Sequence, residues 1–271
     1  MAEIRIEGLG KLYGGKQAEA RALAAEGVAK ADILARTGCS VALSGIDLTL
    51  ASGEISVIMG LSGSGKSTLL RCLIRLIDPS FGAIRFDGAD ITTYSLAELR
   101  AFRRRTASMV FQNFALLPHK SVLANAAFGL TLQGVRRREA EERAAQWLEQ
   151  LGLAGYERAL PGALSGGMRQ RVGLARALAS DPQVLLMDEA FSALDPLIRA
   201  ELQDQLLGLQ RDLGKTVVFV THDIAEALKL GNRIAVMREG RVEQFASPAE
   251  LLANPATPYV ARFVGQAEGG R

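Results

Sequence analysis

Eight consecutive residues in the first third of the chain could bind a polyphosphate. They read Gly60-Leu61-Ser62-Gly63-Ser64-Gly65-Lys66-Ser67 and fit the pattern G-x-x-x-x-G-K-[ST]. The glycines of such a loop let consecutive backbone N–H groups approach anionic oxygens, which any Cβ would obstruct. Lys66 is then expected to reach the β- and γ-phosphates, and the Ser67 hydroxyl to bind Mg²⁺. The sequence therefore predicts a loop that binds a nucleoside triphosphate.

The segments on both sides of this loop have the pattern that such a loop requires. Residues 54–59 are a short, mostly apolar run, as expected for a buried strand. After the loop, apolar residues recur at helical spacing, namely Leu69, Leu70, Leu73, Ile74 and Ile77. A helix that begins at the loop directs the positive end of its dipole at the phosphates. We therefore expect a strand, the loop and a helix in this order.

A second run of residues could hold the metal ion and activate water. Val184-Leu185-Leu186-Met187-Asp188-Glu189 places two carboxylates after four apolar residues. A buried strand that ends in acids delivers them to the edge of an α/β sheet where ligands bind. Asp188 can bind Mg²⁺ directly or through water, and Glu189 can polarise the attacking water. Because apolar strands often end in acids, this run gains its meaning from the phosphate-binding loop before it.

A third run lies just before these acids and reads Leu164-Ser165-Gly166-Gly167-Met168-Arg169-Gln170-Arg171. By itself it is a serine N-cap with two glycines that opens a helix. In front of an Asp-Glu strand, it matches the LSGG signature of ABC ATPases. The resemblance implies that the signature helix of one subunit faces the γ-phosphate bound to the other. Ser165, Gly166 and Gly167 would then complete the partner's site in trans, and two copies of the chain would share ATP.

The resemblance implies roles for two residues near the attacking water. Gln112, at the end of an expected strand over residues 108–111, corresponds to a glutamine that contacts Mg²⁺, the water and the transmembrane partner. A surface amide is the alternative interpretation. His222 corresponds to the histidine that contacts the γ-phosphate and orients Glu189, whereas a lone histidine at a strand end is usually structural. The implied catalytic residues are Glu189, His222 and Gln112, and the implied Mg²⁺ ligands are Ser67, Gln112 and Asp188.

Two more residues complete the implied site. Asp195 ends the run Ser192-Ala193-Leu194-Asp195, which is similar to the loop along the dimer interface of ABC ATPases, and it is also a good N-cap before Pro196. Tyr13 resembles the aromatic residue that stacks on adenine, with a packed tyrosine as the alternative. The implied ATP-binding residues are the eight of the loop, Thr68 and Tyr13.

The resemblance extends to one subfamily. Most ABC ATPases have proline after the Asp-Glu pair and glutamine after Ser-Gly-Gly, where this chain has Ala190 and Met168. The surrounding segments closely resemble the ATP-binding subunits of glycine betaine, proline and choline importers; these segments are residues 60–68, 114–119, 164–179 and 187–199. The resemblance therefore implies ATP-driven uptake of a quaternary amine or a related compound. Histidine or another amino acid is the alternative substrate, because some short relatives are associated with histidine uptake.

Osmoregulatory members of this subfamily usually continue into tandem CBS domains, and this sequence ends at Arg271. We therefore expect no built-in sensor of ionic strength, which weakens an osmotic role. A non-transport ABC ATPase, either DNA-associated or regulatory, is the alternative from another functional class. DNA-associated members separate the loop from the signature by a coiled coil or zinc modules, and neither pattern is present between Lys66 and Ser165.

The fold class follows from the order of the elements together with the resemblance. Apolar strands alternate with helices, which is typical of a mostly parallel α/β sheet. We expect an ABC-type P-loop NTPase fold with a RecA-like parallel core, an antiparallel β subdomain and an α-helical subdomain, as a single domain over residues 1–271. The expected parts are a β-rich N-terminal region with a helical insertion over about 17–36, a helical subdomain over about 113–164 and a helical end over about 247–265.

Composition is consistent with a peripheral subunit rather than a membrane-spanning or nucleic-acid-binding chain. No apolar stretch approaches the roughly 18 residues that a membrane span requires, and the net charge of +3 is too small to indicate nucleic acid. Cys39 and Cys72 have no metal-binding spacing, so we expect two reduced core residues. The implied cofactors are ATP and Mg²⁺. The implied partners are a second copy, a transmembrane permease and a periplasmic or lipid-anchored binding protein, at the cytoplasmic face of the plasma membrane.

Overall fold

The computed structural model describes residues 2–268 and begins with an antiparallel sheet. Its strands lie in the order β2-β1-β4-β5, with Ile4 of β1 opposite both Leu50 of β2 and Phe86 of β4. Buried and more exposed residues largely alternate along β1 and β2, so one face of the sheet packs against the core. The bounds are β1 (Ile4–Tyr13), β2 (Ser40–Leu50), β4 (Phe81–Phe86) and β5 (Ala89–Asp90).

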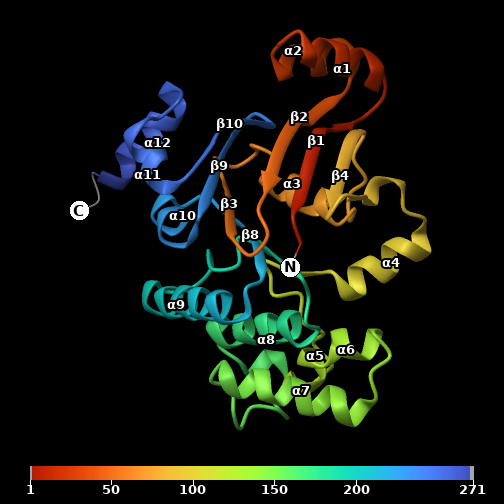
Figure 1. Cartoon of the computed structure of the whole chain (residues 1–271), viewed down its shortest axis with the longest axis vertical. Helices are drawn as coiled ribbons and strands as arrows, with labels where there is room; N and C mark the ends of the chain where they lie inside the picture. Colours follow the sequence, from red (N-terminus) through yellow and green to blue (C-terminus); the bar gives the residue numbers. More distant parts are fainter. Residues whose placement is uncertain (1, 269–271) are drawn as a thin grey trace. The chain divides into compact units, whose positions relative to one another are not determined.

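Two short helices interrupt the sheet between β1 and β2. The stretch predicted as one helical insertion forms α1 (Gln17–Ala25) and α2 (Lys30–Thr37), separated by a turn in which Gly27 has a φ of 80°. Figure 1 shows them at the far end of the strands, in red. Their apolar residues pack on Leu12 and Val41 of the sheet, and the shared cluster also contains Leu23, Ile33 and Cys39. The insertion is therefore anchored by a small core of its own.

The described chain divides into two compact units, residues 96–217 and residues 2–95 with 218–268. The second of these contains the antiparallel sheet and a further group of strands in the order β10-β9-β3. β3 and β9 pair in parallel, with Val57 opposite Ile234. The remaining bounds are β3 (Ile55–Met59), α3 (Lys66–Leu73), η1 (Ile91–Thr93), α10 (Ile224–Leu230), β9 (Arg233–Arg238), β10 (Arg241–Ala246), α11 (Pro248–Ala253) and α12 (Pro258–Glu268).

The unit formed by residues 96–217 consists mostly of helices around a parallel pair of strands. β6 and β7 pair with Ala107 opposite Val184, and α4 and α8 pack against β6. Figure 1 shows α5 to α8 grouped together, in green. The bounds are α4 (Leu96–Arg105), β6 (Ala107–Val110), α5 (Val122–Ala126), α6 (Phe128–Leu132), α7 (Arg137–Gln150), η2 (Pro161–Ala163), α8 (Gly166–Ala179), β7 (Val184–Asp188) and α9 (Pro196–Leu213); β8 (Thr216–Thr221) begins here and ends in the other unit.

These elements confirm the predicted fold class, an α/β protein with parallel strands and an antiparallel β subdomain. No helix of the described residues is long and apolar enough to cross a bilayer. Cys39 and Cys72 are both buried and free. Desolvation by burial raises the pKa of the Cys72 thiol to about 12, so this side chain is a neutral packing residue.

The helix after the glycine-rich loop is shorter than its apolar spacing predicts. α3 ends at Leu73, Arg75 has a φ of 49°, and Ile77 lies outside the helix, so the expectation that the helix continues to Ile77 was wrong. The reason is long-range, because Arg75 turns away to bond a distant segment. Its guanidinium donates to the carbonyl oxygens of Ile91 at 3.0 Å and Tyr94 at 2.8 Å.

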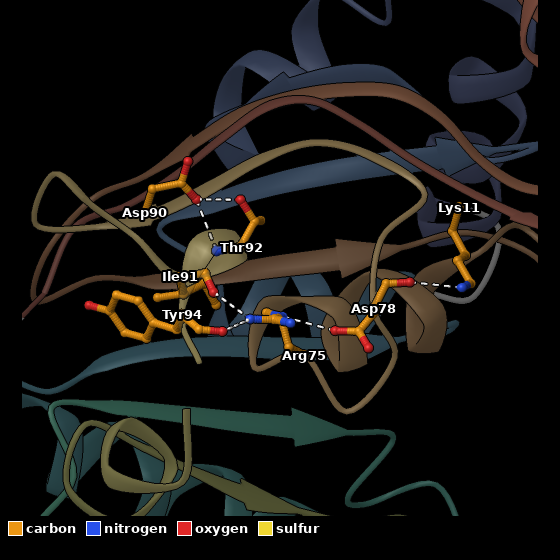
Figure 2. A network of polar contacts seen from close by, with 7 residues as sticks. All are labelled: Lys11, Arg75, Asp78, Asp90, Ile91, Thr92 and Tyr94. Atoms are coloured by element: carbon orange, nitrogen blue, oxygen red, sulfur yellow. Dashed lines mark hydrogen bonds and ion pairs between the residues drawn. The ribbon is translucent and has the colours of Figure 1, made fainter. Parts of the chain in front are cut away.

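Figure 2 shows Arg75 at the centre of this polar cluster. Its Nε also bonds the Asp78 carboxylate at 2.9 Å, and the Lys11 ammonium donates to the Asp78 carbonyl oxygen at 2.7 Å. The side chain of Arg75 is only 15% exposed. The cluster thus ties the end of α3 to β1 and to the segment around η1.

Replacing Ile33 should test the anchoring of the insertion. Ile33→Ala removes a side chain that is 1% exposed and should destabilise the protein by about 2–5 kcal/mol, because it leaves a cavity in the cluster. Leu34→Ala is the matched control, since Leu34 is 50% exposed and should cost under about 0.5 kcal/mol. Urea denaturation measures both. Equal losses for the two variants would show that the insertion is not packed as described.

Replacing Arg75 should test the polar cluster. Arg75→Met removes charged hydrogen bonds to two carbonyl groups and a carboxylate, so we expect a loss of about 1.5–3 kcal/mol or more. Arg36→Met on the exposed face of α2 is the control, with an expected loss below about 0.5 kcal/mol. If Arg75→Met unfolds at the same urea concentration as the control, the cluster does not stabilise the end of α3.

Candidate functional site

The glycine-rich loop joins β3 to α3 and is shaped by close backbone neighbours. Gly60 and Gly65 have φ values of 152° and 102°, which side chains rarely adopt. A Cβ on Gly60 would lie 2.2 Å from the carbonyl oxygen of Met237, and one on Gly65 would lie 2.8 Å from that of Ala42. These two glycines are therefore required by the packing of the loop as well as by its predicted ligand.

Lys66 is the first residue of α3 and its side chain folds back on the loop. The ammonium Nζ donates to the carbonyl oxygens of Gly60 at 2.8 Å and Leu61 at 3.1 Å, and the residue is 5% exposed. Ser67 and Thr68 follow in the first turn of the helix, where both are partly buried. The positive charge is thus fixed on the loop itself, next to the N-terminus of α3.

The turn between β9 and β10, for which no role is predicted from the sequence, hydrogen-bonds to this loop. Gly240, between β9 and β10, donates its N–H to the carbonyl oxygen of Ser64 at 2.9 Å and accepts a bond of the same length from the N–H of Ser44. A Cβ on Gly240 would lie 2.3 Å from the carbonyl oxygen of Ala42. The Glu239-Gly240 pair between two strand patterns is a hairpin signal that could have revealed the turn, although not its contact with the loop.

Tyr13 and His222 belong to the same unit as the loop. Tyr13 ends β1, is 43% exposed and has the Lys11 ammonium 4.9 Å from its ring centroid, so the ring is accessible for stacking. His222 is exposed and directly follows β8. The Asp223 carboxylate accepts bonds from the N–H groups of Ala225 and Glu226, which fixes the start of α10 immediately after His222.

Gln112 and Glu189, which lie far apart in the sequence, are brought together in the other unit. The Gln112 amide Nε2 donates to the Glu189 carboxylate at 3.4 Å. Glu189 follows the buried Asp188, which ends β7, and has a φ of 45°, an uncommon conformation for a residue with a side chain. β7 therefore ends at Asp188, one residue before the end of the run over residues 184–189. The Asp188 carboxylate is buried and that of Glu189 is partly exposed.

The signature run opens α8 as expected. Ser165 is exposed at the N-cap position and its hydroxyl accepts a bond from the N–H of Met168 at 3.3 Å. A Cβ on Gly167 would lie 2.7 Å from a methyl group of Ile198 in α9, whereas one on Gly166 would meet only Leu194 at 3.7 Å. At position 167 a side chain would need Ile198 of α9 to move, whereas Gly166 has room for a side chain.

Asp195 lies at the N-cap of α9 with Pro196 at the first helical position, but its side chain makes no capping hydrogen bond. Arg199 instead holds the preceding turn, because its guanidinium donates to the carbonyl oxygen of Leu194 at 3.1 Å. The carboxylate of Asp195 is thus not used to cap its own helix.

Comparisons with known proteins found a matching family model, similar sequences and a similar solved structure. The family model described as ABC transporter matches residues 43–192. The chain is 51% identical over 262 residues to the glycine betaine transport ATP-binding protein OpuAA of Bacillus subtilis, an alignment that covers 97% of this chain and 63% of OpuAA. It is also 51% identical over 261 residues to ProV of Escherichia coli, the ATP-binding protein of a glycine betaine/proline betaine transport system, covering 96% of this chain and 65% of ProV.

The chain thus spans slightly less than two thirds of the length of these relatives. A similar solved structure is the ATP-binding cassette MJ0796 bound to ADP and Pi, a dimer in a post-hydrolysis state. It has a TM-score of 0.77 and 32% identity, and the match covers 90% of this chain and 98% of that chain. The family match over more than half of the chain and the identity to these relatives lead to one conclusion: the chain belongs to the ABC transporter family.

Proposed function

We propose that this chain is the ATP-hydrolysing subunit of an importer for glycine betaine or a chemically related quaternary amine. The observation that carries the proposal is the 51% identity, over 97% of the chain, to an ATP-binding protein of glycine betaine transport. The phosphate-binding loop and the Gln112–Glu189 contact supply the chemistry that such a subunit needs.

In this proposal the loop binds the triphosphate of ATP. Backbone N–H groups of residues 60–65 and the N-terminus of α3 face the phosphate oxygens, and the Lys66 ammonium exchanges its loop carbonyls for the β- and γ-phosphates. Ser67 and Thr68, in the first turn of α3, bind phosphate oxygens as well. Tyr13 stacks its accessible ring on the adenine.

Three residues suit the accompanying Mg²⁺ by their donor chemistry. The Ser67 hydroxyl, the Gln112 amide oxygen and the Asp188 carboxylate are all hard oxygen donors, which is the ligand type that Mg²⁺ prefers. The ion, when bound, would neutralise charge on the phosphate oxygens. Asp188 is 3% exposed, so its carboxylate is held at the buried end of β7.

Glu189 is the proposed general base, which removes a proton from the attacking water. Its carboxylate accepts the Gln112 amide at 3.4 Å, and this bond restricts the positions that the carboxylate can take. The Ser192 hydroxyl donates to the carbonyl oxygen of Glu189 at 2.9 Å and fixes its backbone. His222 is proposed to contact the γ-phosphate.

The proposed assembly contains two copies of the chain and a transmembrane permease. The exposed Ser165, with Gly166 and Gly167, caps the ATP of the partner copy, and Asp195 lies at the same interface. The dimeric state of the similar cassette MJ0796 supports this pairing. Residues 113–135 receive the permease, which holds the subunit at the cytoplasmic face of the plasma membrane, and an external binding protein delivers the substrate.

Glu189→Gln in the reconstituted transporter tests this function. With permease, binding protein and glycine betaine, wild-type protein should hydrolyse ATP faster than without substrate. Glu189→Gln should slow hydrolysis by about 10²- to 10⁴-fold, because the amide cannot accept the proton, and should keep ATP binding. Glu142→Gln on the exposed surface of α7 is the control and should retain the wild-type rate.

Two results would contradict the proposal. A wild-type rate for Glu189→Gln would remove Glu189 from the role of base. Stimulation by histidine, with none by glycine betaine, choline or proline, would make the complex an amino-acid importer.

A further inference from the structure

A cavity of about 260 Å³ lies in the unit that contains the phosphate-binding loop. The residues that line it come from the adjoining ends of α1 and α2 with the turn between them, from one stretch of β2, and from the hairpin of β9 and β10. Figure 1 labels these five elements. Neither Tyr13 nor any residue of 60–68 lines it. It is therefore separate from the residues to which ATP binding is assigned.

Lys30 is the charged group in the cavity wall that most needs a counter-ion. Lys30 is partly buried, and among the described residues its ammonium makes no hydrogen bond and lies within 4.0 Å of no carboxylate. Desolvation by burial lowers the pKa of Lys30, and the charge of Glu239 opposes this only in part. Since the charge of Glu239 only partly offsets the cost of burying this ammonium, a bound anion would stabilise it further.

The rest of the wall supplies further positive charge beside an apolar surface. Arg241 donates a hydrogen bond to the carbonyl oxygen of Ala24, which fixes its guanidinium beside the end of α1. Arg238 also lines the cavity and lies 4.0 Å from the Glu239 carboxylate; both side chains are substantially exposed, at 46% and 68%, so water screens both charges. With Glu243, the wall contains two carboxylates and three cations, the latter being Lys30, Arg238 and Arg241. The apolar part of the wall consists of Val28, Ile33 and Val41.

The cavity also touches the turn that braces the phosphate-binding loop. Glu239 and Ser44 line the cavity, and both adjoin Gly240: Glu239 precedes it in the chain, and the N–H of Ser44 donates to its carbonyl oxygen. Gly240 in turn donates to the carbonyl oxygen of Ser64 in the loop. The turn also lies close to β2, since a Cβ on Gly240 would be 2.3 Å from the carbonyl oxygen of Ala42.

We propose that this cavity binds a small organic anion, a carboxylate or phosphate with a short apolar part, and that its occupation strengthens nucleotide binding at the loop. The anion meets Lys30 and Arg241, and its apolar part rests on Ile33 and Val41. Occupation immobilises the turn at residues 239–240 and hence Ser64, so less conformational entropy remains to be lost when a nucleotide binds. This second part rests on the proposed ATP binding, whereas the anion site does not.

Labelling with pyridoxal 5′-phosphate tests the site in the absence of nucleotide. This probe carries an anionic phosphate on an aromatic body; a lysine amine adds to its aldehyde with loss of water, and borohydride reduces the resulting imine to a stable adduct that peptide mass spectrometry can locate. Lys30 should be labelled faster than the exposed Lys16, and benzoate should slow the labelling of Lys30 only. Labelling of Lys30 that is no faster than that of Lys16, or that benzoate does not slow, would overturn the site.

The linkage is tested by the affinity for a fluorescent ATP analogue, with benzoate added at constant ionic strength. Benzoate should tighten binding to the wild type by about fivefold or more, the lower range of typical coupling between sites. Lys30→Met should lose this effect, and the control Lys16→Met should keep it. If benzoate protects Lys30 but leaves the affinity for the analogue unchanged or weaker, the proposed linkage between the two sites is wrong. If neither the variants nor the wild type bind the analogue, the proposed ATP binding is wrong, and the labelling result still decides whether the anion site exists.

Discussion

The glycine-rich loop of residues 60–67 has almost no space around its backbone, and much of the surrounding structure depends on this constraint. The carbonyl oxygen of Met237 would lie 2.2 Å from a Cβ on Gly60, and that of Ala42 would lie 2.8 Å from one on Gly65. Glycine at both positions lets β9 and β2 approach the loop directly. The loop is thereby shaped before any ligand binds, which reduces the entropy that binding has to overcome.

The same close packing explains why elements remote in sequence can affect the loop. β2 belongs to the antiparallel sheet, carries Val41 of the cluster that anchors α1 and α2, and bonds Gly240 through Ser44. The insertion between β1 and β2 is therefore connected to Ser64 through Val41 and Ser44 of β2 and then through Gly240. In the unit of residues 96–217, Glu189 is likewise defined by its neighbours, since Gln112 and Ser192 bond its side chain and backbone.

Local chemistry could be predicted from the sequence, and long-range contacts could not. The strand before the loop, the helix after it and the serine cap of α8 follow from apolar spacing and capping residues, and the structure contains all three. The predicted end of α3 was wrong because Arg75 bonds carbonyl groups about twenty residues away, and no local sequence pattern encodes such a contact. The brace at Gly240 and the cavity at Lys30 were missed for the same reason, because each combines residues from both ends of the chain.

The central claim is that the loop holds a nucleoside triphosphate through Lys66, and equilibrium binding of a fluorescent ATP analogue to Lys66→Ala tests it most directly. Lys66 now bonds two loop carbonyls, and in the complex it would bond phosphates instead. Since each charged hydrogen bond contributes about 1.5–3 kcal/mol, we expect the variant to bind the analogue about tenfold more weakly or worse. A cooperative thermal unfolding transition of the variant should show that it is still folded. An unchanged affinity in a folded variant would contradict the account.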